Sequence, residues 1–310
     1  MLSDIQKTIL KSARIKGVGL HTGVITSLEL KPALPNTGIV FKRTDINDNK
    51  KNSIKANFKN VSSAKLCTKI ENSYGVSIST IEHLMAAFHG EGIDNIIVEV
   101  NNEEVPIMDG SAIPFVKLIR STGLKKQNVS NKFIEVLKKV EVREGLKFIS
   151  IEPQKRKLKI DFKLVYENDL IGSQREEITI NKNNLEKIYS ARTFCLYEDI
   201  EKIKSIGLAK GGSLENAVVV KGKKILNEGG LRDKNEFVKH KILDCLGDLM
   251  LSEHRIFGLI KTERGGHQLT NSLLLKFFSD SSNWRFASHE KEEADRRKNY
   301  NYVRPVAVSA

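Results

Sequence analysis

The sequence predicts an α+β fold divided into two domains, and three observations support this. At 310 residues, the chain is long enough to bury two compact cores. With 40% hydrophobic and 29% charged residues, its composition is that of a globular protein. In each half, stretches with the apolar pattern of strands precede stretches with the pattern of helices. This parallel order is the only indication that the two halves arose by internal duplication, since no residue-level repeat is visible.

Strands open the first half. Residues 24–32 and 37–43 alternate or cluster apolar side chains around a turn that contains proline, which predicts a hairpin of antiparallel strands. Residues 93–101 predict another strand. The turn at 108–111 leads into residues 112–120, whose amphipathic pattern predicts a helix.

A polar segment separates the two halves. Residues 123–132 contain glycine, asparagine and serine without apolar periodicity, and we take residues 127–132 as the interdomain linker. The predicted domains are therefore residues 1–126 and 133–310. After the linker we expect strands at residues 133–142, 147–153 and 157–166 and helices at residues 182–189 and 235–252.

The net charge of +13 favours an anionic partner, such as nucleic acid, a membrane surface or a phosphorylated small molecule. A solvated lysine-rich surface explains the same charge equally well. Only 6% of the residues are aromatic and no nucleic-acid recognition motif is present, so we expect no nucleic-acid partner. No apolar stretch is long enough to span a bilayer, and Met1–Lys11 lacks the features of a secretory signal, so we expect a cytoplasmic protein.

The segment 79–88 predicts a helix that carries the first candidates for chemistry. Ser79 and Thr80 suit its N-terminal cap. Its apolar face consists of Ile81, Leu84, Met85 and Phe88. Glu82 and His83 must face elsewhere. By itself, such an adjacent Glu-His pair is more typical of a solvated helix face.

The helix expected at 235–252 gives a more specific signal. His240, Asp244 and Asp248 recur every four residues and share one side of it. A histidine and an aspartate one turn apart can bind the same zinc ion. Catalytic zinc usually takes three protein ligands, and His83 is a good candidate for the third. Taken alone, this helix is better explained by a surface pair.

A loop histidine completes a hydrolytic set. His267 follows Gly265 and Gly266, where the backbone can turn tightly. Hydrolysis of an amide at a metal needs a base for the water and an acid for the departing amine, and Glu82 and His267 could divide these roles. No other common hydrolase or nucleotide-binding motif is present. Three other histidines have no matching partner in the sequence, and we expect them to be structural or exposed: His89, His254 and His289.

Nearly end to end, the chain resembles the UDP-3-O-acyl-N-acetylglucosamine deacetylases, zinc-dependent enzymes of lipid A synthesis. The motifs that carry the resemblance are GVGLHTG at 17–23, STIEHL at 79–84, GIDN at 92–95, PIMDGS at 106–111, ARTF at 191–194, LNEGGLR at 226–232, the helix from His240-Lys241 to Asp248, and Gly266-His267. The resemblance implies hydrolysis of the N-acetyl group of UDP-3-O-(3-hydroxyacyl)-N-acetylglucosamine, the committed step of the pathway. This UDP-linked acylated amino sugar is thus the expected partner.

The resemblance also implies roles for single residues. One catalytic Zn²⁺ per chain would be bound by His83, His240 and Asp244. Glu82 would be the general base and His267 the cationic partner or general acid, in agreement with the roles inferred from the residues.

Further roles follow from the same resemblance. Thr193 would donate a hydrogen bond to the tetrahedral oxyanion, and Lys241 would contact the substrate near the metal. Asp248 would orient His267 and raise its pKa, and Phe194 would lie against the sugar.

The resemblance implies two similar domains, each a β-sheet layered with helices, packed face to face with the metal site in the cleft between them. An insert at about 195–221 would form a passage for the 3-O-acyl chain. Its expected lining residues are Leu20, Ile200, Ala217 and Val219. The apolar run 217–220 is equally explained as a buried strand. We expect a monomer that makes at most transient contact with the inner membrane surface, and the charged tail 296–310 matches the family poorly.

Two alternatives remain at this point. A zinc amidohydrolase could act on a different acylated amino sugar, which would change the substrate class and not the reaction. A nucleic-acid-binding protein with incidental histidines is the alternative from another class, and it would need salt-sensitive binding to DNA without metal.

Overall fold

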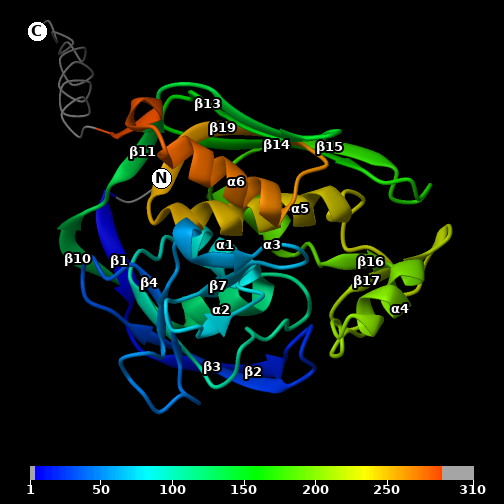
Figure 1. Ribbon diagram of the computed structural model, residues 1–310, viewed down its shortest axis with the longest axis horizontal. Coiled ribbons are helices and arrows are strands. Elements are labelled where there is room, and N and C mark those ends of the chain that lie inside the picture. The colour runs from blue at the N-terminus through cyan, green and yellow to red at the C-terminus, as the bar shows by residue number, and fades with distance from the viewer. Residues whose placement is uncertain (1–3, 288–310) are drawn as a thin grey trace, which may run out of the picture.

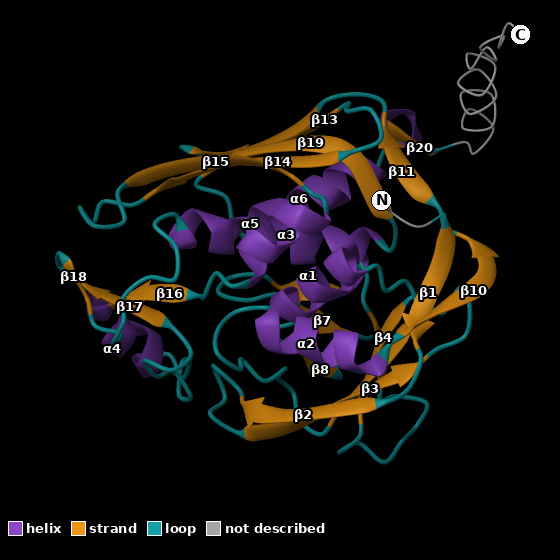
Figure 2. Cartoon of the chain, turned by 180° about the vertical axis from the view of Figure 1, so that it is seen from behind, coloured by secondary structure: helices purple, strands orange, loops and turns teal. Residues whose placement is uncertain are grey.

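The computed structural model describes residues 4–287, and these form an α+β fold. Two sheets lie on the outside of the molecule, and helices from both halves of the chain lie between them (Figures 1 and 2). The α+β class is therefore confirmed. The division into domains at 127–132 stays a prediction, and the tail 296–310 and His289 lie outside the described residues.

The first half supplies one outer sheet and two helices. The strand order is β2-β3-β9-β4-β5, and a smaller sheet has the order β6-β7-β8. The strands of the outer sheet are β2 (Ala13–Val18), β3 (Ile25–Pro32), β4 (Ile39–Arg43), β5 (Ser53–Lys55) and β9 (Ile96–Val100). The remaining elements are η1 (Phe58–Asn60), β6 (Val61–Ser63), β7 (Lys69–Glu71), β8 (Ser77–Ile78), α1 (Glu82–Glu91) and α2 (Ile113–Thr122).

The second half supplies the other outer sheet. Its central strand β19 pairs with β13, β11 and β14. The strands are β11 (Phe133–Val136), β12 (Val140–Glu144), β13 (Lys147–Glu152), β14 (Leu158–Val165), β15 (Ser173–Thr179), β19 (Arg255–Glu263) and β20 (Trp284–Phe286). The helices that accompany it are α3 (Lys182–Tyr189), α5 (Glu236–Leu249), η2 (Met250–Ser252), α6 (His267–Phe278) and η3 (Ser281–Asn283).

The insert is a separate small layer at one side of the molecule (Figure 1). It contains β16 (Phe194–Leu196), α4 (Tyr197–Ser205), β17 (Val218–Lys221) and β18 (Lys224–Ile225), with the strands paired in the order β16-β17-β18. Val218 and Val220 are fully buried, which agrees with the strand predicted as one explanation of this apolar run. Helix α4, in contrast, has no buried residue.

The polar segment expected to be a linker is largely a strand. Residues Leu124–Ser130 form β10, which pairs in antiparallel fashion with β1 (Ile5–Ile9). The segment lacks apolar periodicity because most of its side chains are exposed on this ribbon. Its backbone hydrogen bonds therefore go to a partner that is distant in sequence.

Three local predictions are wrong. Strands β3 and β4 do not form a hairpin, because β9 lies between them, antiparallel to β3 and parallel to β4. Helix α1 has Ile81 at its N-cap without a side-chain cap. Thr80 instead has φ 58° and donates its hydroxyl to Glu104. The stretch predicted as one strand at 133–142 is split between β11 and β12.

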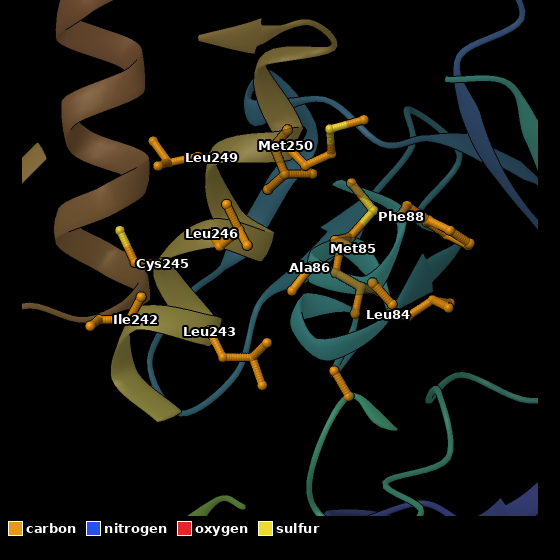
Figure 3. Close-up of a cluster of buried hydrophobic side chains, with 14 of the residues drawn as sticks. Leu84, Met85, Ala86, Phe88, Ile242, Leu243, Cys245, Leu246, Leu249 and Met250 are labelled. Atoms are coloured by element: carbon orange, nitrogen blue, oxygen red, sulfur yellow. The ribbon is translucent and has the colours of Figure 1, made fainter. Parts of the chain in front are cut away.

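Helices α1 and α5 meet across the middle of the molecule. Figure 3 shows Leu84 and Met85 of α1 near Leu243 and Leu246 of α5. Each of these side chains is fully buried, which stabilises the fold by about 1.5–3 kcal/mol per side chain. At the closest approach, a Cβ added to Gly247 would lie 2.0 Å from the carbonyl oxygen of Glu82, so only glycine fits. The contact fixes α5 against the start of α1.

Within residues 4–287, no helix combines the length and the apolar character needed to cross a membrane.

Candidate metal centre and active site

Two helices from different halves of the chain bring together three candidate metal ligands. His83 lies in the first turn of α1, and His240 and Asp244 lie one turn apart on α5. One ligand atom from each residue lies within 4.8 Å of the others. All three side chains are buried, as is Glu82 beside them. A solvated helix face and a surface pair, the alternative explanations of these two motifs, are therefore wrong.

The hydrogen bonding of this cluster fits a bound cation. Nε2 of His83 and Nε2 of His240 each lie 3.4 Å from Oδ1 of Asp244. This buried oxygen has no hydrogen-bond partner among the described residues. Nδ1 of His240 lies 3.1 Å from the carbonyl oxygen of Ala191, which places the proton on Nδ1 and leaves the Nε2 lone pair facing Asp244. Two imidazole nitrogens and a carboxylate oxygen form a donor set that suits zinc.

The charge states follow from burial and from close neighbours. Burial lowers the pKa of His240 to about 4, against the opposing effect of Asp244, so this imidazole is neutral near pH 7. Burial would raise the pKa of Asp244, but His240 and Lys241 hold it well below its ordinary value. The cluster thus offers a neutral imidazole and an ionised carboxylate, the forms that bind metal.

Glu82 is buried beside this cluster. Burial raises the pKa of its carboxyl, although His267 and His83 oppose the shift. The backbone N–H of Thr68 donates to Oε2 of Glu82 at 3.2 Å. A raised pKa brings a carboxylate closer to the basicity required to accept a proton from water.

His267 begins α6 and faces Glu82. Its Nδ1 lies 2.7 Å from Oδ2 of Asp248, and its Nε2 lies 3.7 Å from Oε1 of Glu82. Burial would lower the pKa of His267, but the carboxylates of Asp248 and Glu82 outweigh burial and raise the pKa to about 9. The side chain is therefore a cation near pH 7, with Nε2 free to donate a proton.

Thr68, which the sequence analysis missed, connects the two sides of this arrangement. Its hydroxyl donates to Oδ1 of Asp248 at 2.6 Å, while its backbone N–H donates to Glu82. It is buried. A lone threonine in a polar stretch carries no periodicity or motif that would have identified it.

Lys241 lies on the same helix as the metal ligands. Its Nζ donates to Oδ2 of Asp244 at 2.7 Å. Burial would lower the pKa of Lys241, but Asp244 outweighs this and raises it. Lys241 is thus a fixed cation at the edge of the cluster.

A cavity of about 490 Å³ opens onto these groups. The predicted site residues that line it are Leu20, Glu82, His83, Thr193, Phe194, His240, Lys241, Asp244 and His267. Asp248 lies behind His267 and does not line it. The other expected passage residues are outside this cavity as well: Ile200 is half-buried on α4, and Ala217 and Val219 are buried near and on β17.

Thr193 and Phe194 lie where the chain enters the insert. The Phe194 ring packs against Phe237, with centroids 4.9 Å apart, and lies 6.2 Å from the ring of His240. The backbone N–H of Thr193 donates to the carbonyl oxygen of Gly110 at 2.8 Å. A Cβ at Gly110 would lie 2.1 Å from the carbonyl oxygen of Asn216, so the turn requires glycine there.

A buried carboxylate organises the loop on the other side of the cavity. Glu104 is fully buried and accepts hydrogen bonds from the backbone N–H groups of His21 and Thr22 and from the Thr80 hydroxyl. Nδ1 of His21 accepts from the backbone N–H of Ala209 at 3.4 Å, which connects this loop to the insert. His21 stands within a motif identified in the sequence, but no role was predicted for it.

Comparisons with known proteins agree on one family. A sequence model of the family described as UDP-3-O-acyl N-acetylglycosamine deacetylase matches residues 6–279. A protein of Histophilus somni (strain 129Pt) named UDP-3-O-acyl-N-acetylglucosamine deacetylase is 43% identical over 307 residues, which cover 98% of each chain. Proteins with the same name from Haemophilus influenzae (strain PittGG) and Pseudoalteromonas translucida (strain TAC 125) are each 42% identical, covering 98% and 92% of this chain and 98% and 94% of their own.

Proposed function

This chain belongs to the family of UDP-3-O-acyl-N-acetylglucosamine deacetylases, and we propose that its buried His-His-Asp cluster binds one Zn²⁺ and hydrolyses the N-acetyl group of UDP-3-O-(3-hydroxyacyl)-N-acetylglucosamine. The products are acetate and UDP-3-O-(3-hydroxyacyl)-glucosamine. Membership of the family places the chain at the deacetylation step of lipid A biosynthesis. The observation that carries the proposal is the convergence of three ligand atoms, a base and a cationic histidine at one cavity.

His83, His240 and Asp244 hold the zinc in this proposal. When bound, zinc polarises the acetyl carbonyl and makes a water molecule more acidic. The unpartnered Oδ1 of Asp244 supports this assignment, because a buried anionic oxygen without a hydrogen bond is costly unless a cation compensates it. The donor set also suits ferrous iron or cobalt, and zinc is the metal that the family implies.

Glu82 and His267 move the protons. The Glu82 carboxylate removes a proton from the water that attacks the acetyl carbonyl. Nε2 of His267 then donates a proton to the amine nitrogen as the C–N bond breaks. Asp248 holds His267 in its charged form through Nδ1, as the 2.7 Å contact supports.

Three further groups surround the reacting carbonyl. The Thr193 hydroxyl donates a hydrogen bond to the oxyanion, which stabilises charge that develops in the transition state. Lys241 contacts the substrate beside the cluster, and the Phe194 ring lies against the sugar. All three line the same cavity, which supports these roles.

The insert provides the passage for the 3-O-acyl chain, with Leu20, Ile200, Ala217 and Val219 along its course. Leu20 lines the catalytic cavity, which supports a path that begins there. We propose that the enzyme works as a cytoplasmic monomer that touches the inner membrane surface only transiently. The surplus of positive charge supports attraction to anionic lipid.

The proposal is tested by measuring bound metal and acetate release on the same preparation. We expect about one zinc per chain by elemental analysis, and acetate release that chelation abolishes and added zinc restores. Asp244→Ala should lose both zinc and turnover, whereas Asp169→Asn, at an exposed position, should keep both. Acetate release that persists without metal would contradict the proposal. Equal efficiency on an acylated amino sugar without the nucleotide would instead support the amidohydrolase alternative.

A further inference from the structure

A second cavity lies at the other end of helix α1. It has a volume of about 630 Å³ and is larger than the catalytic cavity. His89, Gly90 and Glu91 contribute the end of α1 to its wall, and Leu158 and Phe257 come from the outer sheet of the second half. The cavity therefore lies where the two halves of the chain meet. Not one of its lining residues belongs to the catalytic cavity.

The lining of this second cavity has a surplus of positive charge. Its cationic side chains are Lys7, Arg120, Arg156, Lys157, Lys182 and Arg255, against the acidic Asp4 and Glu91. Arg120 is engaged by Glu91 at 2.8 Å, and Arg255 pairs with Asp94. Lys157 and Lys182 are exposed and have no ion pair within residues 4–287. Their charges remain available to an anion.

A buried imidazole points to a ligand independently of these charges. His89 lines the cavity, is only 3% exposed, and its Nδ1 has no hydrogen-bond partner in the described part of the chain. Burial and the nearby Arg255 hold the pKa of His89 well below its ordinary value, so the ring is neutral. A neutral imidazole has one donor and one acceptor nitrogen, and a buried nitrogen without a partner is unfavourable unless a ligand or water satisfies it.

Apolar side chains and the start of a helix form further parts of the wall. Leu158, Leu185 and Phe257 are buried side chains that face this cavity. Helix α3 begins at the wall with Lys182, after its N-cap residue Asn181, so the positive end of a helix dipole adds to the lysine charge. At and just beyond the end of α1, the carbonyl oxygens of Phe88 and Ile93 accept hydrogen bonds from Arg255. The positive charge of Arg255 therefore offsets the repulsion that these oxygens would exert on an anion.

We propose that this second cavity binds a small molecule that carries a phosphate group and an apolar or aromatic part. The phosphate pairs with Lys157 and Lys182 at the start of α3, and the apolar part lies on Leu158 and Phe257. His89 donates to or accepts from the buried end of the ligand. A metal ion does not fit, because cations outnumber carboxylates in the wall, and a bare acyl chain would leave the lysines without partners.

The probe is phenyl phosphate, titrated by calorimetry into the full-length zinc-loaded protein. We expect one site per chain in about the millimolar range, which is typical for so small a ligand. Lys157→Glu/Lys182→Glu should weaken binding by about tenfold or more, because two positive charges beside the phosphate become negative, a net change of four units. The matched control is Lys202→Glu/Lys204→Glu, an exposed lysine pair on α4, and it should leave binding within about twofold of wild type.

Two further measurements locate the site. His89→Phe should weaken the binding of phenyl phosphate by several-fold, because the variant loses the imidazole that contacts the ligand. Benzoate should bind more weakly than phenyl phosphate because it carries less charge. A crystal soaked with the probe should place the phosphate beside Lys182. Acetate release by the Lys157→Glu/Lys182→Glu variant should match wild type, which verifies its fold.

Four results would overturn the proposal. Phenyl phosphate without measurable binding is the first. The second is equal binding to wild type and to Lys157→Glu/Lys182→Glu. The third is density for the phosphate only at the metal cluster. Stronger binding of benzoate would contradict the phosphate class.

Discussion

The candidate metal cluster, which consists of His83, His240 and Asp244, and the insert are neighbouring regions built in opposite ways. His83, His240, Asp244 and His267 are each less than 10% exposed and come from three helices packed in the middle of the molecule. In the insert, α4 has no buried residue and is attached through the strand pairs of β16, β17 and β18. This contrast fits the proposed roles, because proton transfer at an amide needs groups fixed to a fraction of an ångström, whereas contact with a flexible acyl chain does not.

The two regions meet at Phe194. This residue begins β16, yet its ring packs on Phe237 at the start of α5. The insert is thus anchored at the cavity while its far end is exposed. The contrast predicts that changes in the cluster alter the rate of the chemical step, and changes in the insert alter the affinity for one part of the substrate.

The largest effect is expected from Glu82→Gln. The amide keeps the shape of the side chain but cannot accept a proton, so kcat should fall by about 10³-fold, within the usual range for a general base. Zinc content should stay at the wild-type level, and Glu103→Gln at a nearby exposed position should have no effect. Wild-type turnover in the Glu82→Gln variant would show that Glu82 is not the general base. The contrast between the cluster and the insert would then fail.

A smaller effect is expected from Asp248→Asn. Because the pKa of His267 is raised to about 9, the imidazolium persists up to that pH, and activity should decline as the pH rises through it. Removing the Asp248 charge lowers this pKa, so the alkaline limb of the kcat/KM profile should move to lower pH. We expect kcat near pH 7.5 to fall by about 10- to 100-fold. An unmoved alkaline limb would show that another group sets it.

Thr68→Val should have a milder effect on the same cluster. It removes the hydroxyl that donates to Asp248 and keeps the backbone N–H that donates to Glu82. As Thr68 is a positioning residue, kcat should fall by about threefold to tenfold with KM unchanged. Thr44→Val, at an exposed threonine, is the control. An increase in KM alone would assign Thr68 to substrate binding instead.

The smallest effect on turnover is expected in the insert. Ile200→Asp should raise KM for a long 3-O-acyl substrate by about fivefold and leave kcat and zinc content unchanged, because it places a charge beside an apolar chain. With a short 3-O-acyl group the KM should match wild type. Ile206→Asp, at a position on the same segment that is 58% exposed, is the control. Equal KM changes for both chain lengths would contradict the passage.

Much of the cluster was predictable because its chemistry imposes a pattern. The four-residue spacing of His240, Asp244 and Asp248 indicates one helix face in any fold. Thr68 was not predictable, since its role depends on a loop folding over two helices.

The fold was predictable where side chains alternate or repeat with helical period. The α3 prediction at 182–189 agrees with the structure, and α5 with η2 covers nearly the whole stretch predicted at 235–252. The polar strand β10 escaped prediction because its partner β1 lies more than a hundred residues earlier. The prediction of the α1 cap failed for a similar reason. Glu104, which is distant in sequence, accepts a hydrogen bond from the Thr80 hydroxyl that was expected to cap the helix.

The two histidines of the metal cluster lie on α1 and α5, and about half of the 310-residue chain separates them. Closing such a long loop is entropically costly and slow compared with forming either helix. During synthesis on the ribosome, the first half contributes only His83 of the three candidate ligands, and one imidazole alone holds a metal weakly. The proposed zinc site is therefore complete only after α5 has been synthesised and has packed against α1.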